Sequence, residues 1–329
     1  MNKVVVTGGG GFIGSAIVRK LLARGDRVVV IGRSSYPELT AIGVPCLQGD
    51  ISDQGFINRA FVGVDLVFHV AARAGIWGPW QDYVQTNIQG TATVIQSCLK
   101  NHVPSLVYTS TPSVVFNRHD LEGVDERIPY ARRSLCHYAT SKIIAEKLVL
   151  QANCPQLSTV AIRPHLVWGP GDPHLIPRLL DRGRKGMLKI IGRGQNRVDI
   201  AYIDNVVHAH LLAADNLCGP GDAAGRAFFI GERQPVLLWD WINTLFSELE
   251  IEPVRQKVPL AVAYCIGGLL EVVHGSLQLS REPRMTRFLA LQLARSHWFS
   301  HAAAEDILGY QPIVTVGEGM KLFLHSRIG

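Results

Sequence analysis

Tyr138 and Lys142 are the two residues whose types and spacing are best suited to acid–base chemistry. They stand four positions apart in a segment whose pattern predicts a helix over residues 138–151, so both side chains project from one helical face. A nearby ammonium group favours the phenolate form and lowers the pKa of a tyrosine from its usual value of about 10. We therefore predict that Tyr138 exchanges a proton with a carbonyl or a secondary alcohol, assisted by Lys142.

A hydroxyl-rich stretch, residues 109–113, ends a predicted strand that lies earlier in the chain. A hydroxyl at this place would bind the substrate oxygen beside Tyr138 and stabilise negative charge that develops on it. Thr111 and Ser113 are the candidates. Short hydroxylated residues next to a proline are equally typical of turns, so the sequence leaves both interpretations open.

The beginning of the chain carries a phosphate-binding pattern. Three glycines, Gly8, Gly11 and Gly14, follow a run of valines and precede a segment with helical spacing, and Phe12 and Ile13 stand between the last two. In such a strand–turn–helix unit the glycines permit a tight turn and a close approach of the backbone to a pyrophosphate. The free N–H groups at the helix N-terminus then bind the phosphates, so the pattern predicts a dinucleotide site.

The end of the second predicted strand, residues 27–31, indicates which dinucleotide is bound. Enzymes that use NAD commonly have an acidic residue there to hold the ribose hydroxyls, whereas this chain reads Gly32, Arg33, Ser34. A guanidinium group pairs with a 2′-phosphate, and a serine hydroxyl donates to it, so we predict NADP(H). The alternative is that Arg33 stacks on the adenine in a site that does not discriminate.

Two further strand ends complete the predicted cofactor site. Asp50 and Ile51 follow the third predicted strand, where the carboxylate of Asp50 is placed to accept from the adenine amino group. The alternative for Asp50 is an N-cap or a turn residue. Ala71 and Ala72 end the fourth strand, and their small side chains let the backbone lie against the cofactor.

Strands and helices alternate through the first half of the chain, which predicts parallel βαβ units. Right-handed crossovers then give an α/β fold with a Rossmann-type doubly wound parallel sheet. We assign residues 1–165 to an NADP-binding domain and residues 166–329 to a smaller α/β substrate domain. A strand and helix near residues 199–215 are expected to return to the first domain.

Three segments bear on the substrate. Trp77 and Trp80 follow the fourth strand, at the sheet edge where ligands bind in α/β folds, and either form an apolar ligand wall or anchor their own loop. The apolar segment 258–273 is a core helix, a lid over a lipid-like substrate or a surface for peripheral membrane contact. The basic stretch 178–197 is a solvated surface or attracts an anionic cofactor or substrate.

The composition narrows the classes of function. Apolar residues make up 47% of the 329 residues and charged residues 18%, as in a globular protein, and the net charge of +6 is modest. No dense basic stripe with interleaved aromatic residues points to nucleic acid. The six cysteines form no C-x-x-C pair, so no metal site is predicted. With neither a signal-peptide pattern nor an apolar run long enough to span a bilayer, we expect a cytoplasmic protein.

Together these motifs resemble the extended short-chain dehydrogenase/reductases, and in particular their 3β-hydroxysteroid dehydrogenase-like branch. The matching segments are Gly8-x-x-Gly11-x-x-Gly14, Asp50, residues 69–72, residues 87–91, residues 108–115, Tyr138 with Lys142, and Arg163-Pro164. The resemblance implies that Pro164 and His165 lie near the nicotinamide amide. It places the catalytic hydroxyl on Thr111, where the family usually has serine, and a phenylalanine, Phe116, where the family often has glycine.

Within that branch the sequence is similar to the reductases of bacterial long-chain olefin biosynthesis that act on 2-alkyl-3-oxoalkanoic acids. The similarity includes residues 33–39, 74–78, 168–172, 202–205 and 286–289. It implies NADPH-dependent reduction of a lipid-like β-keto acid, a homodimer formed through helices near residues 83–99 and 138–151, and contact with other enzymes of the pathway. Alternatives are an NAD-dependent 3β-hydroxysteroid dehydrogenase, a nucleotide-sugar epimerase or reductase, and a non-catalytic NADP(H)-binding protein.

Overall fold

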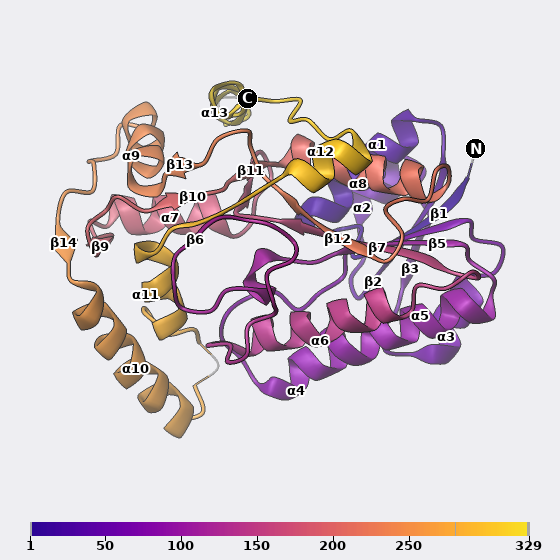
Figure 1. Cartoon of the computed structure of the whole chain (residues 1–329), viewed down its shortest axis with the longest axis horizontal. Helices are drawn as coiled ribbons and strands as arrows, with labels where there is room; N and C mark the ends of the chain where they lie inside the picture. Colours follow the sequence, from indigo (N-terminus) through magenta and orange to yellow (C-terminus); the bar gives the residue numbers. More distant parts are fainter. Residues whose placement is uncertain (1, 280, 328–329) are drawn as a thin grey trace.

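A seven-stranded sheet forms the centre of the computed structural model, which describes residues 2–279 and 281–327 (Figure 1). The strand order is β12-β7-β5-β4-β1-β2-β3, and every pairing is parallel. The strands are β1 (Lys3–Thr7), β2 (Arg27–Gly32), β3 (Cys46–Gln48), β4 (Leu66–His69), β5 (Ser105–Thr109), β7 (Ser158–Pro164) and β12 (Arg226–Ile230). The predicted doubly wound parallel sheet is confirmed.

Helices cover both faces of this sheet because its strands are apolar on both faces. In β1, Val4 and Val6 pack into one buried cluster and Val5 into another on the opposite face. One face is covered by α1 (Phe12–Ala23) and α8 (Ile203–Leu217), and the other by α3 (Gln54–Ala60), α5 (Gly90–Lys100) and α6 (His137–Gln151). Because all seven strands are parallel, their carboxyl ends meet at one edge of the sheet.

The helix expected over residues 83–99 is interrupted. The segment consists of α4 (Trp80–Tyr83), a π-helical turn η1 (Val84–Gln89) and then α5. A π turn inserts an extra residue into the helical ladder and often marks a functional site. Here it contains the buried Asn87, whose contacts are described below.

The segment near residues 199–215 adds a helix to the layers of the large sheet but no strand to the sheet itself. Helix α8 packs against α1, but β11 (Ala201–Tyr202) pairs with β8 (Val167–Trp168) outside the seven-stranded sheet. The strand that joins the sheet is β12, beside β7. The buried carboxylate of Asp199 accepts hydrogen bonds from Phe299 N at 2.9 Å and His301 Nε2 at 3.1 Å, and so ties this segment to the C-terminal part.

A four-stranded sheet organises the smaller part, in the order β13-β10-β15-β6. Its strands are β13 (Val236–Leu237), β10 (Arg197–Val198), β15 (His297–Phe299) and β6 (Leu121–Val124). The other helices and strands of the whole structure are α2 (Pro37–Ala41), η2 (Pro112–Val114), α7 (Leu175–Arg184), β9 (Ile190–Ile191), α9 (Leu238–Glu248), β14 (Lys257–Val258), α10 (Leu260–Ser276), α11 (Arg287–Ala294), α12 (Ala302–Leu308) and α13 (Val316–His325). Since β6 comes from the first half of the chain, the two parts exchange segments.

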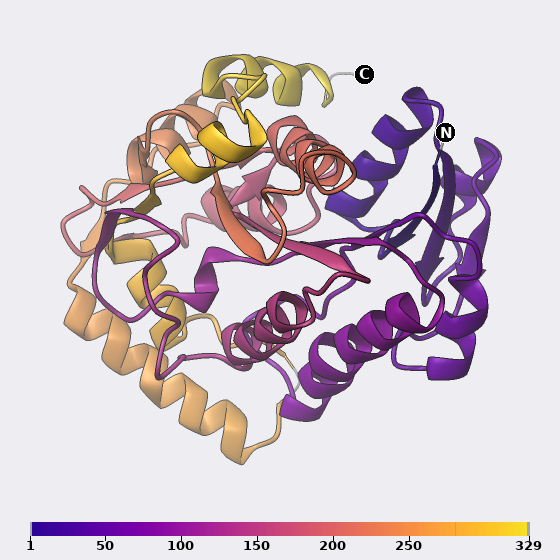
Figure 2. The same ribbon diagram turned by 45° about the vertical axis from the view of Figure 1, so that its right-hand side comes forward.

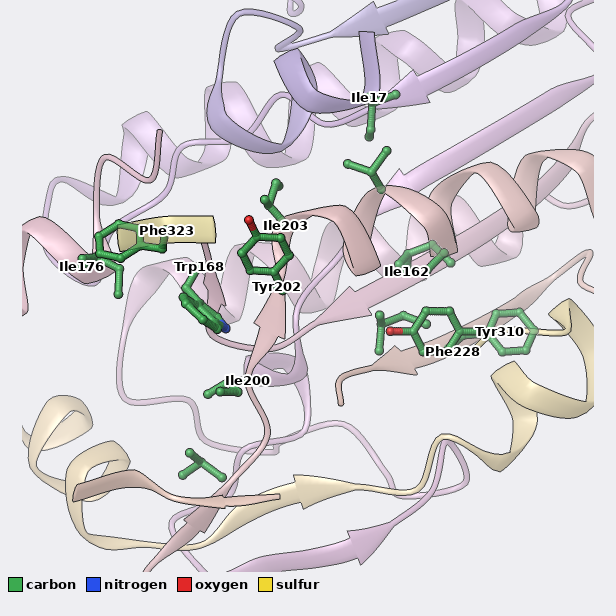
Figure 3. Close-up of a cluster of buried hydrophobic side chains, with 14 of the residues drawn as sticks. Ile17, Ile162, Trp168, Ile176, Ile200, Tyr202, Ile203, Phe228, Tyr310 and Phe323 are labelled. Atoms are coloured by element: carbon green, nitrogen blue, oxygen red, sulfur yellow. The ribbon is translucent and has the colours of Figure 1, made fainter. Parts of the chain in front are cut away.

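One buried cluster joins the two parts. Figure 3 shows Ile17 and Ile162 of the large sheet layer in the same cluster as Trp168, Tyr202 and Phe323. Trp168 and Tyr202 meet edge to face with ring centroids 5.3 Å apart. A shared core holds the smaller part in a fixed position over the carboxyl edge of the sheet (Figure 2).

A buried ion pair connects α6 to β7. Arg163 donates from Nε to Glu146 Oε2 at 2.9 Å and from Nη2 to Oε1 at 2.5 Å, and the two side chains are 4% and 0% exposed. Tyr130 donates a further hydrogen bond to Oε1 at 2.7 Å. Burial alone would raise the pKa of Glu146, but the hydrogen bonds and charge of Arg163 lower it below its usual value. The carboxylate is therefore ionised and satisfied.

We predict that Arg163→Met lowers the free energy of unfolding by about 3–5 kcal/mol, because the Glu146 carboxylate would stay buried without its partner. Urea denaturation followed by circular dichroism measures the change. The control is Lys185→Met, which breaks an exposed ion pair with Asp181 within α7 and should cost less than about 0.5 kcal/mol. Equal effects of the two substitutions would contradict the role given to burial.

Candidate active site

The glycine turn has the geometry of a backbone cradle. Gly8 has φ +69°, and a Cβ on it would lie 2.7 Å from the Cα of Ala71. A Cβ on Gly14 would overlap the carbonyl of Gly8, so helix α1 approaches the turn as closely as the backbone allows. Gly11 is the N-cap of α1, and no side chain caps this helix end. Its first N–H groups are thus available to a phosphate, as the dinucleotide pattern requires.

A cavity of about 430 Å³ runs from this turn across the carboxyl edge of the sheet. It brings together most of the residues predicted for the cofactor: Gly8, Gly11, Phe12, Ile13, Gly14, Arg33, Asp50, Ile51, Ala71, Ala72, Tyr138, Lys142 and Pro164. Thr111 lines the same cavity. Residues separated by more than 150 positions therefore share one cleft, whose lining of glycine turn, arginine and carboxylate suits a dinucleotide.

The end of β2 contains a residue that the sequence interpretation did not single out. Tyr36 lines the cavity together with Arg33, and its ring fills the space that a side chain on Gly10 or Gly32 would occupy. Arg33 is exposed, and its backbone carbonyl accepts from Gln48 Nε2 at 3.0 Å. Ser34 is also exposed and is not part of the cavity wall. The glycine motif includes no tyrosine, so nothing in the sequence indicated that Tyr36 lines the cavity.

Asp50 combines the two interpretations that the sequence left open. Its Oδ1 accepts from the backbone N–H of Ser52 at 2.8 Å and from the Ser52 hydroxyl at 2.7 Å, which is a turn arrangement. Asp50 also lines the cavity, and Oδ2 makes no hydrogen bond within the described residues. The turn thus fixes the carboxylate and leaves one oxygen for a ligand.

Tyr138 and Lys142 both face the cavity from α6, as their spacing predicts. The pKa of Tyr138 is raised to about 12 by burial, although the neighbouring hydroxyl of Thr111 partly opposes the rise. We expected the ammonium group of Lys142 to lower this pKa, and that expectation is wrong for the protein alone. The reason is that burial of the phenol dominates.

Lys142 is 2% exposed, and its ammonium group is held away from solvent. Nζ donates to the carbonyl oxygen of Thr109 at 2.7 Å and lies 4.1 Å from the centre of the Tyr108 ring. Burial lowers the pKa of Lys142 to about 7, and the negative charge of Glu146, one turn along α6, opposes that change. The amine therefore titrates near neutral pH, as is common for groups in active sites.

The hydroxyl stretch supplies three residues of the cavity wall, Thr109, Ser110 and Thr111, and one supporting residue, Ser113. Thr111 N-caps η2: its hydroxyl accepts from Ser113 N at 3.2 Å and donates to Ser113 Oγ at 3.2 Å. Ser113 is not part of the cavity wall, whereas Thr111 is. The sequence could not separate the turn role from the site role, and in the structure Thr111 combines the two positions.

Asn87, in the π turn, fixes two walls of the site at once. Its Oδ1 accepts from Arg73 N at 2.7 Å, and its Nδ2 donates to Ser141 Oγ at 2.8 Å. Ser141 in turn donates to the backbone carbonyl of Tyr138 at 2.8 Å. The residue matched the family motif but carries no signal of its own for this bridge, because its partners are far away in the sequence.

These features are shared with known proteins. Residues 5–261 match the 3-beta hydroxysteroid dehydrogenase/isomerase family. The chain belongs to this family. As a member of it, the protein is an oxidoreductase that acts on a hydroxyl or keto group with a nicotinamide cofactor.

Curated relatives match nearly the whole chain. A 2-alkyl-3-oxoalkanoate reductase of Shewanella oneidensis is 46% identical over 329 residues, covering 98% of this chain and 85% of that protein. The protein of the same name from Stenotrophomonas maltophilia is 43% identical over 321 residues, covering 97% of each. A decarboxylating sterol-4-alpha-carboxylate 3-dehydrogenase of Mus musculus is 35% identical over 332 residues, covering 99% of this chain and 91% of that one.

Solved structures agree with the fold. The crystal structure of gox2253 superposes with a TM-score of 0.79 at 25% identity, covering 99% of this chain and 98% of that one. MoeE5 in complex with UDP-glucose and NAD gives a TM-score of 0.76 at 24% identity, with 99% and 98% covered. At this level of identity the second likeness shows the fold alone.

Pro164 and His165 were both predicted to lie near the nicotinamide, but their side chains have different surroundings. Pro164 lines the cavity at the end of β7, but the side chain of His165 turns toward the smaller part. Its Nε2 is 2.6 Å from Nδ1 of His297, and burial followed by the charge of His297 lowers its pKa well below the usual value. His165 is thus a neutral, buried packing residue, and any contact with a ligand comes from its backbone.

The tryptophan loop borders a second cavity, of about 530 Å³, beside the segment that leads into Tyr138. Trp77 lines this cavity and donates from Nε1 to the carbonyl oxygen of Leu279 at 3.0 Å. Trp80 packs against His137, with ring centroids 5.5 Å apart, outside the cavity wall. The loop is therefore anchored by both rings, and Trp77 also faces the open space.

Between residues 2 and 279 and between 281 and 327, no helix is long and apolar enough to cross a membrane. Nor do the residues in these ranges include a group of three or more histidines, cysteines or acids arranged to hold a metal ion.

We predict that Lys142→Met stabilises the cofactor-free protein, most strongly at pH 6. The folded state binds its proton with a pKa of about 7, whereas the unfolded chain keeps the usual value of about 10.5. Stability of the unaltered protein therefore rises with pH between these two values, and below them the buried charge costs free energy that methionine avoids. Urea denaturation at pH 6 and pH 9.5 should show a gain of at least about 1 kcal/mol that shrinks at the higher pH. A gain that is equal at both values would contradict the low pKa.

Proposed function

We propose that this protein reduces the ketone of a 2-alkyl-3-oxoalkanoic acid, a lipid-like β-keto acid, to the 2-alkyl-3-hydroxy acid with NADPH. The observation that carries the proposal is the convergence of Thr111, Tyr138 and Lys142 on the cavity that begins at the glycine turn. Two relatives that match nearly the full chain at 46% and 43% identity are named 2-alkyl-3-oxoalkanoate reductases, which supports this substrate class.

The preference for NADPH rests on the residues at the end of β2. The strand ends Ile31-Gly32, and the cavity there is lined by Arg33 and Tyr36 with no acidic side chain after the strand. An arginine pairs with the 2′-phosphate of NADP, whereas NAD-selective sites place a carboxylate on the ribose. Ser34, exposed beside Arg33, is a second donor for the phosphate.

The chain's own groups then perform the proton transfer. When bound, NADPH supplies the hydride to the ketone carbon. Tyr138 donates its proton to the ketone oxygen, and the Thr111 hydroxyl donates a hydrogen bond to the same oxygen. A phenol with a pKa of about 12 is protonated at neutral pH, which suits the reductive direction. Lys142 holds the nicotinamide ribose and stabilises the phenolate that remains.

The apolar part of the substrate has a place beside this centre. The second cavity, walled by Ile76, Trp77, Leu135 and Leu279 among others, adjoins the segment leading into Tyr138. Apolar walls suit alkyl chains. Relatives at 35% identity named sterol-4-alpha-carboxylate 3-dehydrogenases make an oxidation of a 3β-hydroxysteroid with NAD the second candidate.

One assay separates the two candidates. We expect NADPH oxidation with a racemic 2-alkyl-3-oxo acid of medium chain length, and slower turnover with NADH. The parallel reaction offers a 3β-hydroxysteroid carboxylate and NAD. Turnover only in the second reaction would keep the Tyr138 chemistry and overturn both the substrate class and the cofactor preference. A homodimer and association with pathway enzymes remain predictions of the family resemblance.

Substitution of Tyr138 tests its role as the proton donor. Tyr138→Phe should lower kcat by roughly 10²–10⁴-fold, because the proton donor is lost while the cavity keeps its shape. NADPH binding, measured by nucleotide fluorescence, should change little. Tyr130→Phe, which also removes the hydroxyl of a partly buried phenol, is the matched control and should leave kcat within a few-fold. Unchanged turnover in the Tyr138 variant would remove the basis for the assignment.

Substitution of Arg33 tests its contact with the 2′-phosphate of NADPH. Arg33→Ala should raise the KM for NADPH by about 10–100-fold, because a charged hydrogen-bond partner is lost, and should leave the KM for NADH nearly unchanged. Arg27→Ala at the opposite end of the same strand is the control and should alter neither value. If NADH is affected as strongly as NADPH, Arg33 contacts the adenine and does not select the phosphate.

A further inference from the structure

Helix α10 buries its small residues and exposes its large apolar ones. Its buried residues are the small Ala263 and Gly267, and a Cβ on Gly267 would lie 2.6 Å from the backbone of Thr286 at the start of α11. The large aliphatic residues face outward instead, with Leu269 64% and Val272 65% exposed. A surface helix of a globular protein normally turns its large apolar residues inward, so this arrangement is not explained by the fold.

The outward residues form one continuous stripe, which we call the α10 stripe: Val262, Ile266, Leu269, Val272, Val273 and Leu277. From Val262 to Val273 it extends for about 17 Å along the helix axis. All exposed positions between residues 261 and 277 are uncharged, since Glu271 is partly buried and paired with Arg287 at 2.6 Å. Figures 1 and 2 show α10 at the periphery of the molecule, with α11 behind it.

Beside the stripe lies a strongly cationic region, which we call the basic rim. Six cations line a cavity of about 850 Å³ that Ala263 and Ile266 of α10 also border: Arg178, Arg182, Lys185, Lys189, Arg281 and Arg284. Only two acids, Asp181 and Glu282, line the same cavity. Burial, followed by the charge of Arg178, lowers the pKa of Arg182, as expected where positive charges are in excess. An apolar stripe next to net positive charge is complementary to an anionic bilayer surface.

We propose that this face of the protein docks on the surface of an anionic phospholipid membrane, with the α10 stripe in the acyl boundary and the basic rim on the headgroups. A second copy of the chain fits less well, because a two-fold contact through α10 would bring the two basic rims together. The cavities on both sides of α10 favour the same face: Ala263 and Ile266 line one, and His274 and Gly275 line the other. An amphiphilic ligand in the bilayer would be delivered beside both.

Vesicle co-sedimentation of the full chain tests the proposal without any turnover. We expect binding to vesicles of phosphatidylglycerol and phosphatidylethanolamine in equal parts at about 0.05 M salt, and weaker binding at about 0.5 M salt or to pure phosphatidylcholine. The double variant Leu269→Gln/Val272→Gln should bind the anionic vesicles at least about tenfold more weakly than the unaltered chain. The double variant Lys189→Gln/Arg284→Gln should lose a similar factor with anionic vesicles only.

The matched control is Ile313→Gln/Leu322→Gln, which changes two exposed aliphatic residues near α13, far from α10 in Figure 1. This variant should bind vesicles like the unaltered chain, and all variants should keep their circular dichroism spectrum and NADPH affinity. Lack of binding to anionic vesicles at low salt, or equal losses in the control, would overturn the proposal. So would a dimer, seen by analytical ultracentrifugation, that the Leu269/Val272 variant abolishes while its vesicle binding is unchanged.

Discussion

The burial of the Lys142 ammonium group is the constraint on which the site depends. A charged amine with 2% exposure costs several kcal/mol unless neighbouring groups replace its hydration. Here the carbonyl of Thr109, the face of the Tyr108 ring and the carboxylate of Glu146 replace only part of it, so the pKa of Lys142 falls to about 7. The contacts with Thr109 and Tyr108 require α6 to lie at a fixed height over the end of β5, whereas Glu146 is on α6 itself. The same position presents Tyr138, one turn earlier, to the cavity.

A series of hydrogen bonds connects β1 to the π-helical turn η1, which in turn contacts α6. Thr7 Oγ1 lies 2.7 Å from His69 Nδ1, His69 Nε2 lies 3.0 Å from Thr91 Oγ1, and the Thr91 hydroxyl donates to the Asn87 carbonyl at 2.6 Å. Since Thr91 uses its proton on that carbonyl, we assign the histidine proton to Nε2. Burial and the charge of Lys142 lower the pKa of His69 to about 3, so the ring stays neutral. The glycine turn and the catalytic helix are thus held by one network.

The cofactor half of the site was predictable because each of its signals is local. The three glycines, the end of β2 and the Tyr138–Lys142 spacing each lie within one strand–turn–helix segment, where the period of the pattern fixes which side chains share a face. The contacts that set the pKa values were not predictable. The burial of Tyr138, which raises its pKa, is a property of the folded packing, and the turn of His165 toward His297 depends on a segment 132 residues away.

The orientation of the elements in the smaller part was not predictable from local patterns, as α10 illustrates. Its sequence is apolar enough for a core helix, and a pattern of apolar residues does not reveal which side of a helix will find a partner. The decisive residues are Ala263 and Gly267, whose small size allows α11 to approach closely and so leaves the large side chains outside. Core helices are normally fixed by their largest residues. Here the smallest residues fix the orientation, and the apolar surface that results is available to something other than the protein's own core.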